Sequence, residues 1–247
     1  MKLILLRHGE SEWNLKNRFT GWKDVDLTSK GREEAAVAAN KILEENINIS
    51  SIHTSILERA QHTTKIVSKI LKFDANKVVY DWRLNERHYG SLEGLNKSET
   101  AKKYGEEQVH IWRRSYDVAP PKLEFDDIRH PRFNKKFAIV PIKKLPTGES
   151  LEMVSERMKP FWENYIKDIK KQFENHMIIA HSNSLRAIVK ILDNKTNEEI
   201  TSLNIPTGVP LVYKFNENFN IESKEFLIDE EKLKLKQKEI ANQGKIK

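Results

Sequence analysis

The stretch LILLRHG at residues 3–9 decides the fold class, because it joins a wholly apolar run to an arginine, a histidine and a glycine. A second stretch, MIIAHSN at residues 177–183, repeats this design. A short apolar run without alternation is typical of a strand that is buried on both faces of a parallel sheet. The carboxyl ends of parallel strands meet at one edge, where α/β proteins bind ligands. We therefore expect His8 and His181 to face each other across one crevice.

The rest of the chain alternates between strand and helix patterns. Short apolar runs predict further strands at residues 49–54, 78–82, 211–215 and 221–227. Apolar residues at three- and four-residue steps predict helices at residues 28–43, 57–71, 151–169, 185–192 and 229–240. The inner face of the first helix is expected to hold Ala35, Ala36, Ala39, Ile42 and Leu43, and the third helix is expected to kink at Pro160. The alternation predicts an α/β fold, a three-layer α/β/α sandwich with a mostly parallel sheet, in a single domain over residues 1–247.

Two segments fall outside this pattern. Residues 118–146 are rich in Pro, Lys and Asp and show no period, which predicts an irregular insertion or a lid. Residues 229–247 predict a charged C-terminal helix followed by a loose tail.

Composition limits the class of protein. The chain has 247 residues, a formal net charge of +7 and no cysteine, which excludes disulfides, thiolate metal sites and cysteine nucleophiles. Its apolar start is too short for a signal peptide or a membrane anchor, so we expect a cytoplasmic protein without a membrane partner. The positive charge fits a nucleic-acid binder, a membrane-surface protein or an enzyme for anionic metabolites. Because the notable arginines sit at strand ends rather than along one helix face, we expect no nucleic-acid partner.

The Arg-His-Gly run at the end of the first strand suits phosphoryl transfer. A neutral imidazole on His8 is able to attack phosphorus, and Arg7 is able to bind phosphate oxygens in a bidentate way. Gly9 allows the backbone to approach a phosphate closely. Arg59 follows another strand end and is a candidate second clamp. Taken alone, a single histidine at a strand end is as often structural, but two histidines and two arginines make that interpretation weaker.

A second cluster is WRLNERHYG at residues 82–90, which places charged side chains between aromatic ones. A carboxyl group there is able to exchange a proton with a substrate hydroxyl if its surroundings raise its pKa. The alternative is a salt-bridged turn, and the spacing does not decide between them. Lys97 and the adjacent Arg113 and Arg114, flanked by Trp112 and Tyr116, fit a second anionic group.

Metal and nucleotide sites are not indicated. The eight histidines form no helical metal-binding pair near carboxylates, and no loop has the acidic spacing of a calcium site. There is no Walker loop and no dinucleotide fingerprint. We expect chemistry that rests on His, Arg and Glu without a metal.

At this point the chain resembles the 2,3-bisphosphoglycerate-dependent phosphoglycerate mutases, a family of the histidine phosphatase superfamily. The resemblance covers nearly the whole chain and is carried by LLRHGESEWN (residues 5–14), FTGW (19–22), TSxxxRA (54–60), WRLNERHYG (82–90), GLNKSET (94–100), IWRRSYDV (111–118), NIPTGVPLVY (204–213) and NQGK (242–245). The Arg-His-Gly motif marks only the superfamily, whereas the runs WRLNERHYG and IWRRSYDV are specific to the mutase branch.

The resemblance implies a function and a set of site residues. His8 would carry the phosphoryl group as phosphohistidine, primed by 2,3-bisphosphoglycerate and without a metal, to interconvert 3- and 2-phosphoglycerate. The implied catalytic residues are His8, Glu86, His181, Arg7 and Arg59, with Glu86 as proton donor and acceptor. The implied substrate-binding residues are Arg7, Ser11, Asn14, Thr20, Gly21, Arg59, Glu86, Arg87, His88, Tyr89, Lys97, Arg113, Arg114, Ser182 and Asn183. The partner would be a small phosphorylated acid, and the assembly a homodimer or homotetramer.

One motif position departs from the family, which has glycine where this chain has Ser182. Glycine beside a phosphate usually permits close approach or a positive φ, and forcing serine into such a backbone costs about 1 kcal/mol. Either the backbone tolerates serine, or activity is reduced. Two alternatives stay open. One is a bisphosphoglycerate mutase or phosphatase built on the same site, against which Thr20 and Gly21 favour the mutase. The other, which Ser182 alone supports, is a catalytically weakened paralogue that acts as a binding protein.

Overall fold

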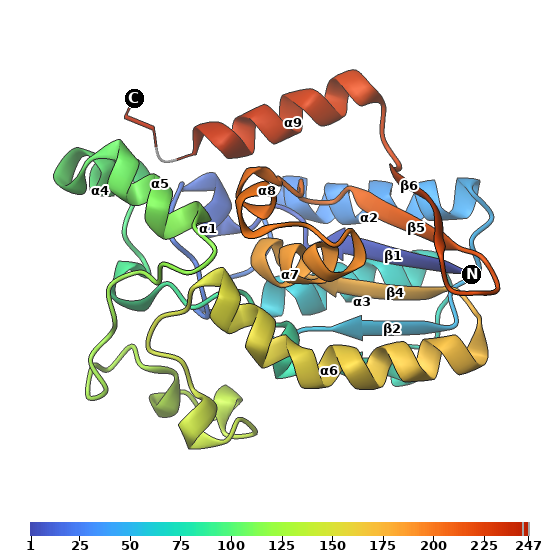
Figure 1. Cartoon of the computed structure of the whole chain (residues 1–247), viewed down its shortest axis with the longest axis horizontal. Helices are drawn as coiled ribbons and strands as arrows, with labels where there is room; N and C mark the ends of the chain where they lie inside the picture. The colour runs from blue at the N-terminus through green and yellow to red at the C-terminus, as the bar shows by residue number, and fades with distance from the viewer. Residues whose placement is uncertain (244, 247) are drawn as a thin grey trace.

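The protein is built around one six-stranded sheet, described by a computed structural model that covers residues 1–243 and 245–246 (Figure 1). The strands are β1 (Lys2–Arg7), β2 (Ser51–Thr54), β3 (Val78–Tyr80), β4 (His176–Ala180), β5 (Pro210–Phe215) and β6 (Ile221–Phe226). Their order is β3-β2-β4-β1-β5-β6, with parallel pairing among the first four and antiparallel pairing at β5 and β6. The carboxyl ends of β1 and β4 are thereby adjacent, as the sequence predicts.

Helices cover both faces of the sheet (Figure 1). They are α1 (Glu12–Leu15), α2 (Ser29–Glu44), α3 (Glu58–Ile70), α4 (Lys97–Tyr104), α5 (Glu106–Arg114), α6 (Leu151–Gln172), α7 (Ser182–Leu192), α8 (Asn197–Ser202) and α9 (Glu230–Asn242). Leu3 and Leu5 pack into the cluster that contains α6 and α7, whereas Ile4 and Leu6 pack into the one that contains α2 and α3. Both faces of β1 are buried, which is why its sequence is apolar throughout. The predicted three-layer α/β sandwich is confirmed.

Several local expectations need correction. In α2 the buried residues include Ala38, while Leu43 is 46% exposed, because the inward stripe follows positions 35, 38, 39 and 42. β3 ends at Tyr80, and Trp82 belongs to the short 3-10 turn η2 (Trp82–Leu84). α6 runs through Pro160 as one helix.

The segment 118–146 contains three 3-10 turns, η4 (Pro131–Phe133), η5 (Lys135–Phe137) and η6 (Ile142–Lys144), and otherwise only bends, turns and loops. It is anchored rather than free, because Phe137 and Val140 pack in a cluster with Trp22. Its action as a lid stays a prediction.

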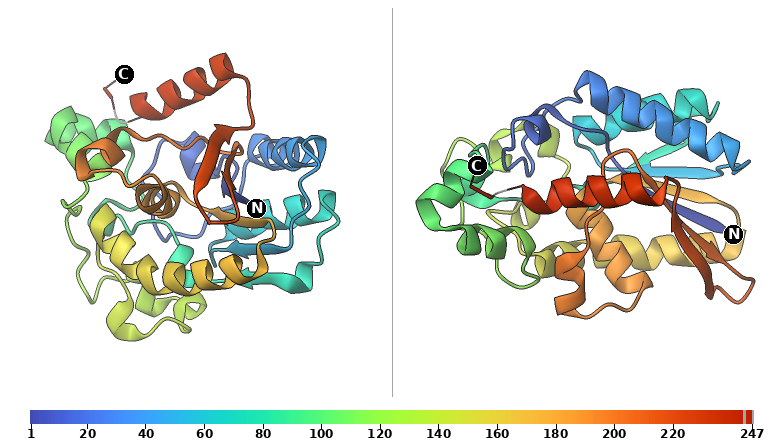
Figure 2. Two further views of the ribbon diagram at one scale, coloured as in Figure 1. Left: turned by 45° about the vertical axis from the view of Figure 1, so that its right-hand side comes forward. Right: turned by 90° about the horizontal axis from the view of Figure 1, so that it is seen from above.

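The C-terminal helix α9 lies along the outside of the molecule and ends beside α4 and α5 (Figure 2). Lys236 pairs with Glu34 of α2 at 2.9 Å, and Gln237 donates to the carbonyl oxygen of Asn204 at 3.3 Å. The predicted tail includes Gly244 and Lys247, which lie outside the described residues. None of the helices in the described part of the chain is both long and apolar enough to cross a membrane.

Candidate active site

A polar pocket opens at the carboxyl ends of β1 and β4. Most of its lining consists of predicted site residues: Arg7, His8, Asn14, Thr20, Gly21, Arg59, Glu86, Tyr89, Lys97, Arg113, Arg114, Ser182 and Asn183. Four further lining residues were missed by sequence reasoning: Arg18, Arg186, Ile240 and Gln243. The topology thus gathers side chains from segments more than 200 residues apart into one site.

His8 follows the last residue of β1 and is 2% exposed. Its Nδ1 lies 2.7 Å from the carbonyl oxygen of Gly9, so the proton sits on Nδ1 and Nε2 keeps its lone pair. Burial, together with the charges of Arg59 and Arg7, lowers the pKa of His8 well below its usual value. The imidazole is therefore neutral at neutral pH, which is the nucleophilic form.

Gly9 is required by close packing. A Cβ there would lie 2.0 Å from the carbonyl oxygen of Gly31, at the start of α2. The Gly9 N–H donates to Thr63 Oγ1 at 3.1 Å. These contacts fix the backbone on which the His8 ring is mounted.

Arg7 and Arg59 are buried beside His8 and are held by carbonyl oxygens. Arg7 Nη1 donates to Ile205 at 2.9 Å, and Arg59 Nη2 donates to Gly21 at 2.8 Å. Burial lowers the pKa of Arg59 to about 10, so Arg59 stays charged at neutral pH, and it also lowers the pKa of Arg7. Since a carbonyl does not neutralise a guanidinium, this charge is available to an anion.

His181 stands next to His8, with the two ring centroids 4.9 Å apart. Its Nε2 lies 2.6 Å from Ser55 Oγ, and burial lowers its pKa well below the usual value. The structure brings the two strand-end histidines together, as expected. His181 itself is fully buried behind the pocket wall rather than part of it.

Glu86 is the carboxyl group of the pocket, and three donors converge on its Oε1. These are the N–H of Arg87 at 2.8 Å, the N–H of Asn183 at 3.1 Å and Asn183 Nδ2 at 2.9 Å. The Asn183 N–H is free because it lies in the first turn of α7. Arg186 Nη1 in turn donates to Asn183 Oδ1 at 2.9 Å, which orients the amide.

The far side of the pocket is strongly cationic. Burial lowers the pKa of Arg113 to about 9 and that of Arg114 to about 10, and it lowers the pKa of Lys97 well below its usual value. Among the described residues that line the pocket, seven are Arg or Lys and Glu86 is the only carboxylate. Such an excess of buried positive charge is costly without a bound polyanion.

The C-terminal helix contributes to this side. Lys97 Nζ donates to Gln243 Oε1 at 3.0 Å, and Arg113 Nη2 donates to the carbonyl oxygen of Ile240 at 3.4 Å.

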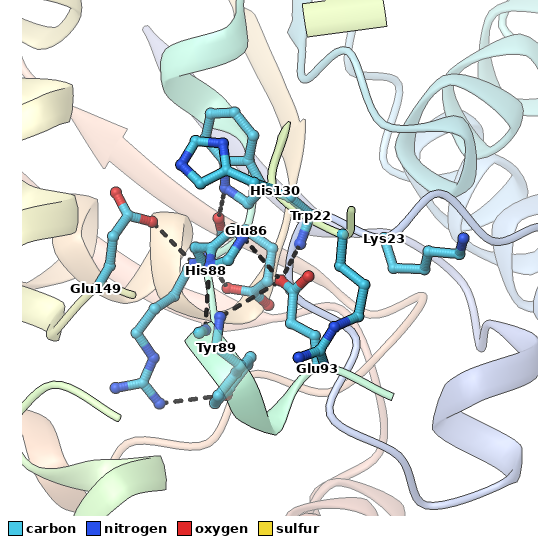
Figure 3. Close-up of polar contacts among 12 residues, drawn as sticks. Trp22, Lys23, Glu86, His88, Tyr89, Glu93, His130 and Glu149 are labelled. Carbon is cyan, nitrogen blue, oxygen red and sulfur yellow. Dashed lines mark hydrogen bonds and ion pairs between the residues drawn. The ribbon is translucent and has the colours of Figure 1, made fainter. Parts of the chain in front are cut away.

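Three predicted substrate-binding residues lie outside the pocket lining, and their contact with substrate stays a prediction. Ser11 caps α1 and donates to Asn14 Oδ1 at 2.9 Å. Arg87 packs its guanidinium 4.7 Å from the ring centroid of Tyr89 and donates to the carbonyl oxygen of Arg113 at 2.6 Å. The His88 side chain lies against Trp22 and Glu93, with its ring centroid 6.3 Å from that of Trp22 (Figure 3).

Glu93 is a supporting residue that sequence reasoning missed. Its Oε1 accepts from the N–H of Trp22 at 2.8 Å and from the N–H of Tyr89 at 3.4 Å (Figure 3). Burial raises the pKa of Glu93 to about 8. It lies against Gly21, where an added Cβ would be 1.7 Å from Glu93 Oε1, and the φ of Gly21 is +53°.

Ser182 begins α7 with helical backbone rather than positive φ. A Cβ at this position therefore causes no conformational strain. The backbone tolerates serine where the family has glycine.

No three His, Cys, Asp or Glu side chains within residues 1–243 and 245–246 come together in a way that would hold a metal ion.

Comparisons with known proteins add an independent finding. Residues 3–130 and 124–221 match the model of the histidine phosphatase superfamily (branch 1). The chain is 49% identical over 247 residues to the 2,3-bisphosphoglycerate-dependent phosphoglycerate mutase of Treponema denticola, with both chains fully covered. It is 49% identical over 246 residues to the enzyme of the same name from Bacteroides fragilis, covering 100% of this chain and 99% of the other.

Among solved structures, a mycobacterial glucosyl-3-phosphoglycerate phosphatase in complex with VO3 aligns with a TM-score of 0.69 at 20% identity, covering 92% of this chain and 98% of the other. A putative alpha-ribazole-5'-P phosphatase from Escherichia coli aligns with a TM-score of 0.64 at 20% identity, covering 92% and 94%. At these identities the likeness concerns the fold alone.

Proposed function

Because this chain belongs to the histidine phosphatase superfamily, and matches two phosphoglycerate mutases at 49% identity along its length, we propose that it interconverts 3- and 2-phosphoglycerate. The reaction is an isomerisation that proceeds through a phosphohistidine on His8. The observation that carries the proposal is the pairing, in one cationic pocket, of a neutral imidazole with a carboxyl group.

The pocket fits 2,3-bisphosphoglycerate as the priming donor. Its lining is rich in guanidinium groups, and Arg7 Nε is buried without a hydrogen-bond partner among the described residues. Arg7 and Arg59 would hold the phosphoryl group beside His8, and Lys97, Arg113 and Arg114 would hold the other anionic groups. When bound, this molecule supplies the first phosphoryl group to His8.

His8 and its neighbours carry the phosphoryl group. The Nδ1–H of His8 stays bonded to the carbonyl oxygen of Gly9, so Nε2 forms the bond to phosphorus. The guanidinium groups of Arg7 and Arg59 would stabilise the negative charge on the phosphoryl oxygens. In the transition state this charge spreads over all three oxygens. His181, whose ring centroid lies 4.9 Å from that of His8, would stabilise charge in the transition state, a role that the family resemblance supports.

Glu86 moves the proton of the reaction. When the phosphoryl group leaves His8 for the free hydroxyl of phosphoglycerate, the N–P bond breaks, an O–P bond forms, and Glu86 takes the hydroxyl proton. The other phosphoryl group then returns to His8, and Glu86 gives the proton to the oxygen left behind. The donors on Oε1 keep the carboxyl group in one orientation throughout.

The finer features belong to the same proposal. Guanidinium groups fill the electrostatic role that metal ions have in other phosphoryl-transfer sites, so we infer that no metal takes part. The family resemblance supports a homodimer or homotetramer and a cytoplasmic location. The partner is a small phosphorylated acid rather than a nucleic acid or a membrane.

A coupled assay of 2-phosphoglycerate formation tests this function. The purified protein should convert 3-phosphoglycerate, the rate should rise when 2,3-bisphosphoglycerate is added, and EDTA should leave it unchanged. Release of inorganic phosphate as the main reaction would instead favour the phosphatase alternative. No turnover of either kind would favour the binding-protein alternative.

A further inference from the structure

Arg157 of α6 forms a buried ion pair behind the pocket. Its Nε donates to Glu149 Oε1 at 2.7 Å, and its Nη2 donates to Glu149 Oε2 at 3.1 Å. The two side chains are only 6% and 4% exposed. Because burying such a pair costs desolvation energy that hydrophobic residues would avoid, stability alone is a weak explanation for it.

The same guanidinium also holds the backbone of the loop that carries Glu86. Its Nη1 donates to the carbonyl oxygen of Arg83 at 2.7 Å, and its Nη2 donates to the carbonyl oxygens of Asn85 and Glu86 at 3.3 Å each. On the other side of Glu86, Glu149 Oε2 accepts the N–H of His88 at 2.8 Å (Figure 3). The ion pair therefore forms hydrogen bonds to the main chain both before and after Glu86.

Trp22 also binds the main chain of this loop. Its Nε1 donates to the carbonyl oxygen of Glu86 at 2.6 Å (Figure 3), and its ring lies 5.6 Å from Arg157 Cζ. The main chain of Glu86 is thus bound by two side chains, while its carboxyl group points the opposite way, to Asn183 in the pocket.

We propose that Arg157 and Glu149 are positioning residues for proton transfer, which set the place of the Glu86 carboxyl group relative to the substrate oxygen. The inference rests on the proposed function, in which Glu86 is the proton donor and acceptor. Neither residue lines the pocket, so both act through Glu86. The planar guanidinium matters because one group must meet a carboxylate and several carbonyl oxygens at once, which a lysine ammonium on a flexible stem does not do.

This role makes a selective prediction about leaving groups. In the mutase reaction, transfer from the bisphosphorylated intermediate to His8 breaks a P–O bond to an alkoxide, which must take the Glu86 proton as the N–P bond forms. Transfer from p-nitrophenyl phosphate breaks a P–O bond to nitrophenolate, which leaves as a stable anion without that proton. Loss of Glu86 positioning should therefore slow the first reaction far more than the second.

The experiment compares Arg157→Lys with the intact protein in both reactions. We expect kcat for phosphoglycerate conversion to fall about 100-fold, with KM within about twofold, while the first-turnover burst of nitrophenolate, which ends with the phosphoryl group on His8, changes in rate by less than about threefold. Arg32→Lys is the matched control, because Arg32 pairs with Asp26 at 2.6 Å on the surface, and both reactions should stay unchanged.

Parallel loss in both reactions, a change confined to KM, or no loss at all would overturn the inference. If Arg157→Lys does not fold, Glu149→Gln is held to the same criteria, since the amide still accepts the His88 N–H but no longer balances the guanidinium; its loss of kcat should be about tenfold. If the intact protein does not convert phosphoglycerate, the proposed function is refuted instead. That result is distinct from the comparison of how much Arg157→Lys slows each of the two reactions.

Discussion

Replacing Gly21 by alanine tests how the phosphate-binding turn is supported. The backbone at Gly21 has a φ of +53°, and an added Cβ would lie 1.7 Å from Glu93 Oε1. The left-handed backbone costs an alanine about 1 kcal/mol. Displacing Glu93 also breaks its hydrogen bond to the buried Trp22 N–H, and leaving this N–H without a partner costs about 1–3 kcal/mol more. We therefore expect unfolding free energy to fall by about 2–4 kcal/mol.

Activity should fall with stability, because the carbonyl oxygen of Gly21 accepts from Arg59 Nη2 at 2.8 Å. Displacement of this turn moves the guanidinium beside His8, and we expect kcat/KM to drop about 10- to 100-fold.

Urea unfolding of Gly21→Ala in the intact protein and in a Glu93→Ala background separates the two causes. Without the Glu93 side chain only the backbone cost of about 1 kcal/mol should remain, because the atom nearest to an added Cβ is gone. A Gly21→Ala loss of the same size in both backgrounds would refute the clash with Glu93.

Two further predictions concern Ser182 and His88. Ser182→Gly should keep or raise turnover in the coupled assay, since the serine backbone is unstrained; a large loss would show that its hydroxyl has a role of its own. Burial lowers the pKa of His88 from 6.5 to about 3, so the unfolded chain binds the extra proton and stability falls as pH drops below 6.5. His88→Gln should remove roughly 2 kcal/mol of the stability lost between pH 6.5 and 5, measured by urea unfolding at each pH; an unchanged slope would contradict this assignment.

Sequence patterns predict the layers of this fold because the buried strands are continuous in sequence. The apolar runs before His8 and His181 place both histidines at one sheet edge without any knowledge of contacts. Helices α4 and α5 were missed because their inward faces carry cations: Lys97, Arg113 and Arg114 are buried where a helix normally buries apolar residues. Buried cations in place of apolar residues removed the usual helical pattern, and the same buried cations indicate that α4 and α5 form part of an anion site.

The supporting residues were beyond sequence reasoning for a different reason. Arg157 contacts Glu86 across 71 positions, and Gln243 reaches Lys97 across 146. Arg157 stands in a pattern that does not differ from an ordinary solvated helix, and Gln243 falls in the predicted loose tail, where the NQGK motif assigns it no contact. Their roles follow only from the tertiary fold, which brings α6 behind the pocket and α9 over its far side.

The central claim is that the phosphoryl group is carried on His8, and intact-mass measurement tests it most directly. After incubation with 2,3-bisphosphoglycerate, the protein should gain the mass of one phosphoryl group, and mild acid should remove it. His8→Ala should gain nothing, whereas Arg32→Lys should behave like the intact protein. Uptake of an acid-labile phosphoryl group by His8→Ala, or no uptake by the intact protein, would contradict the account.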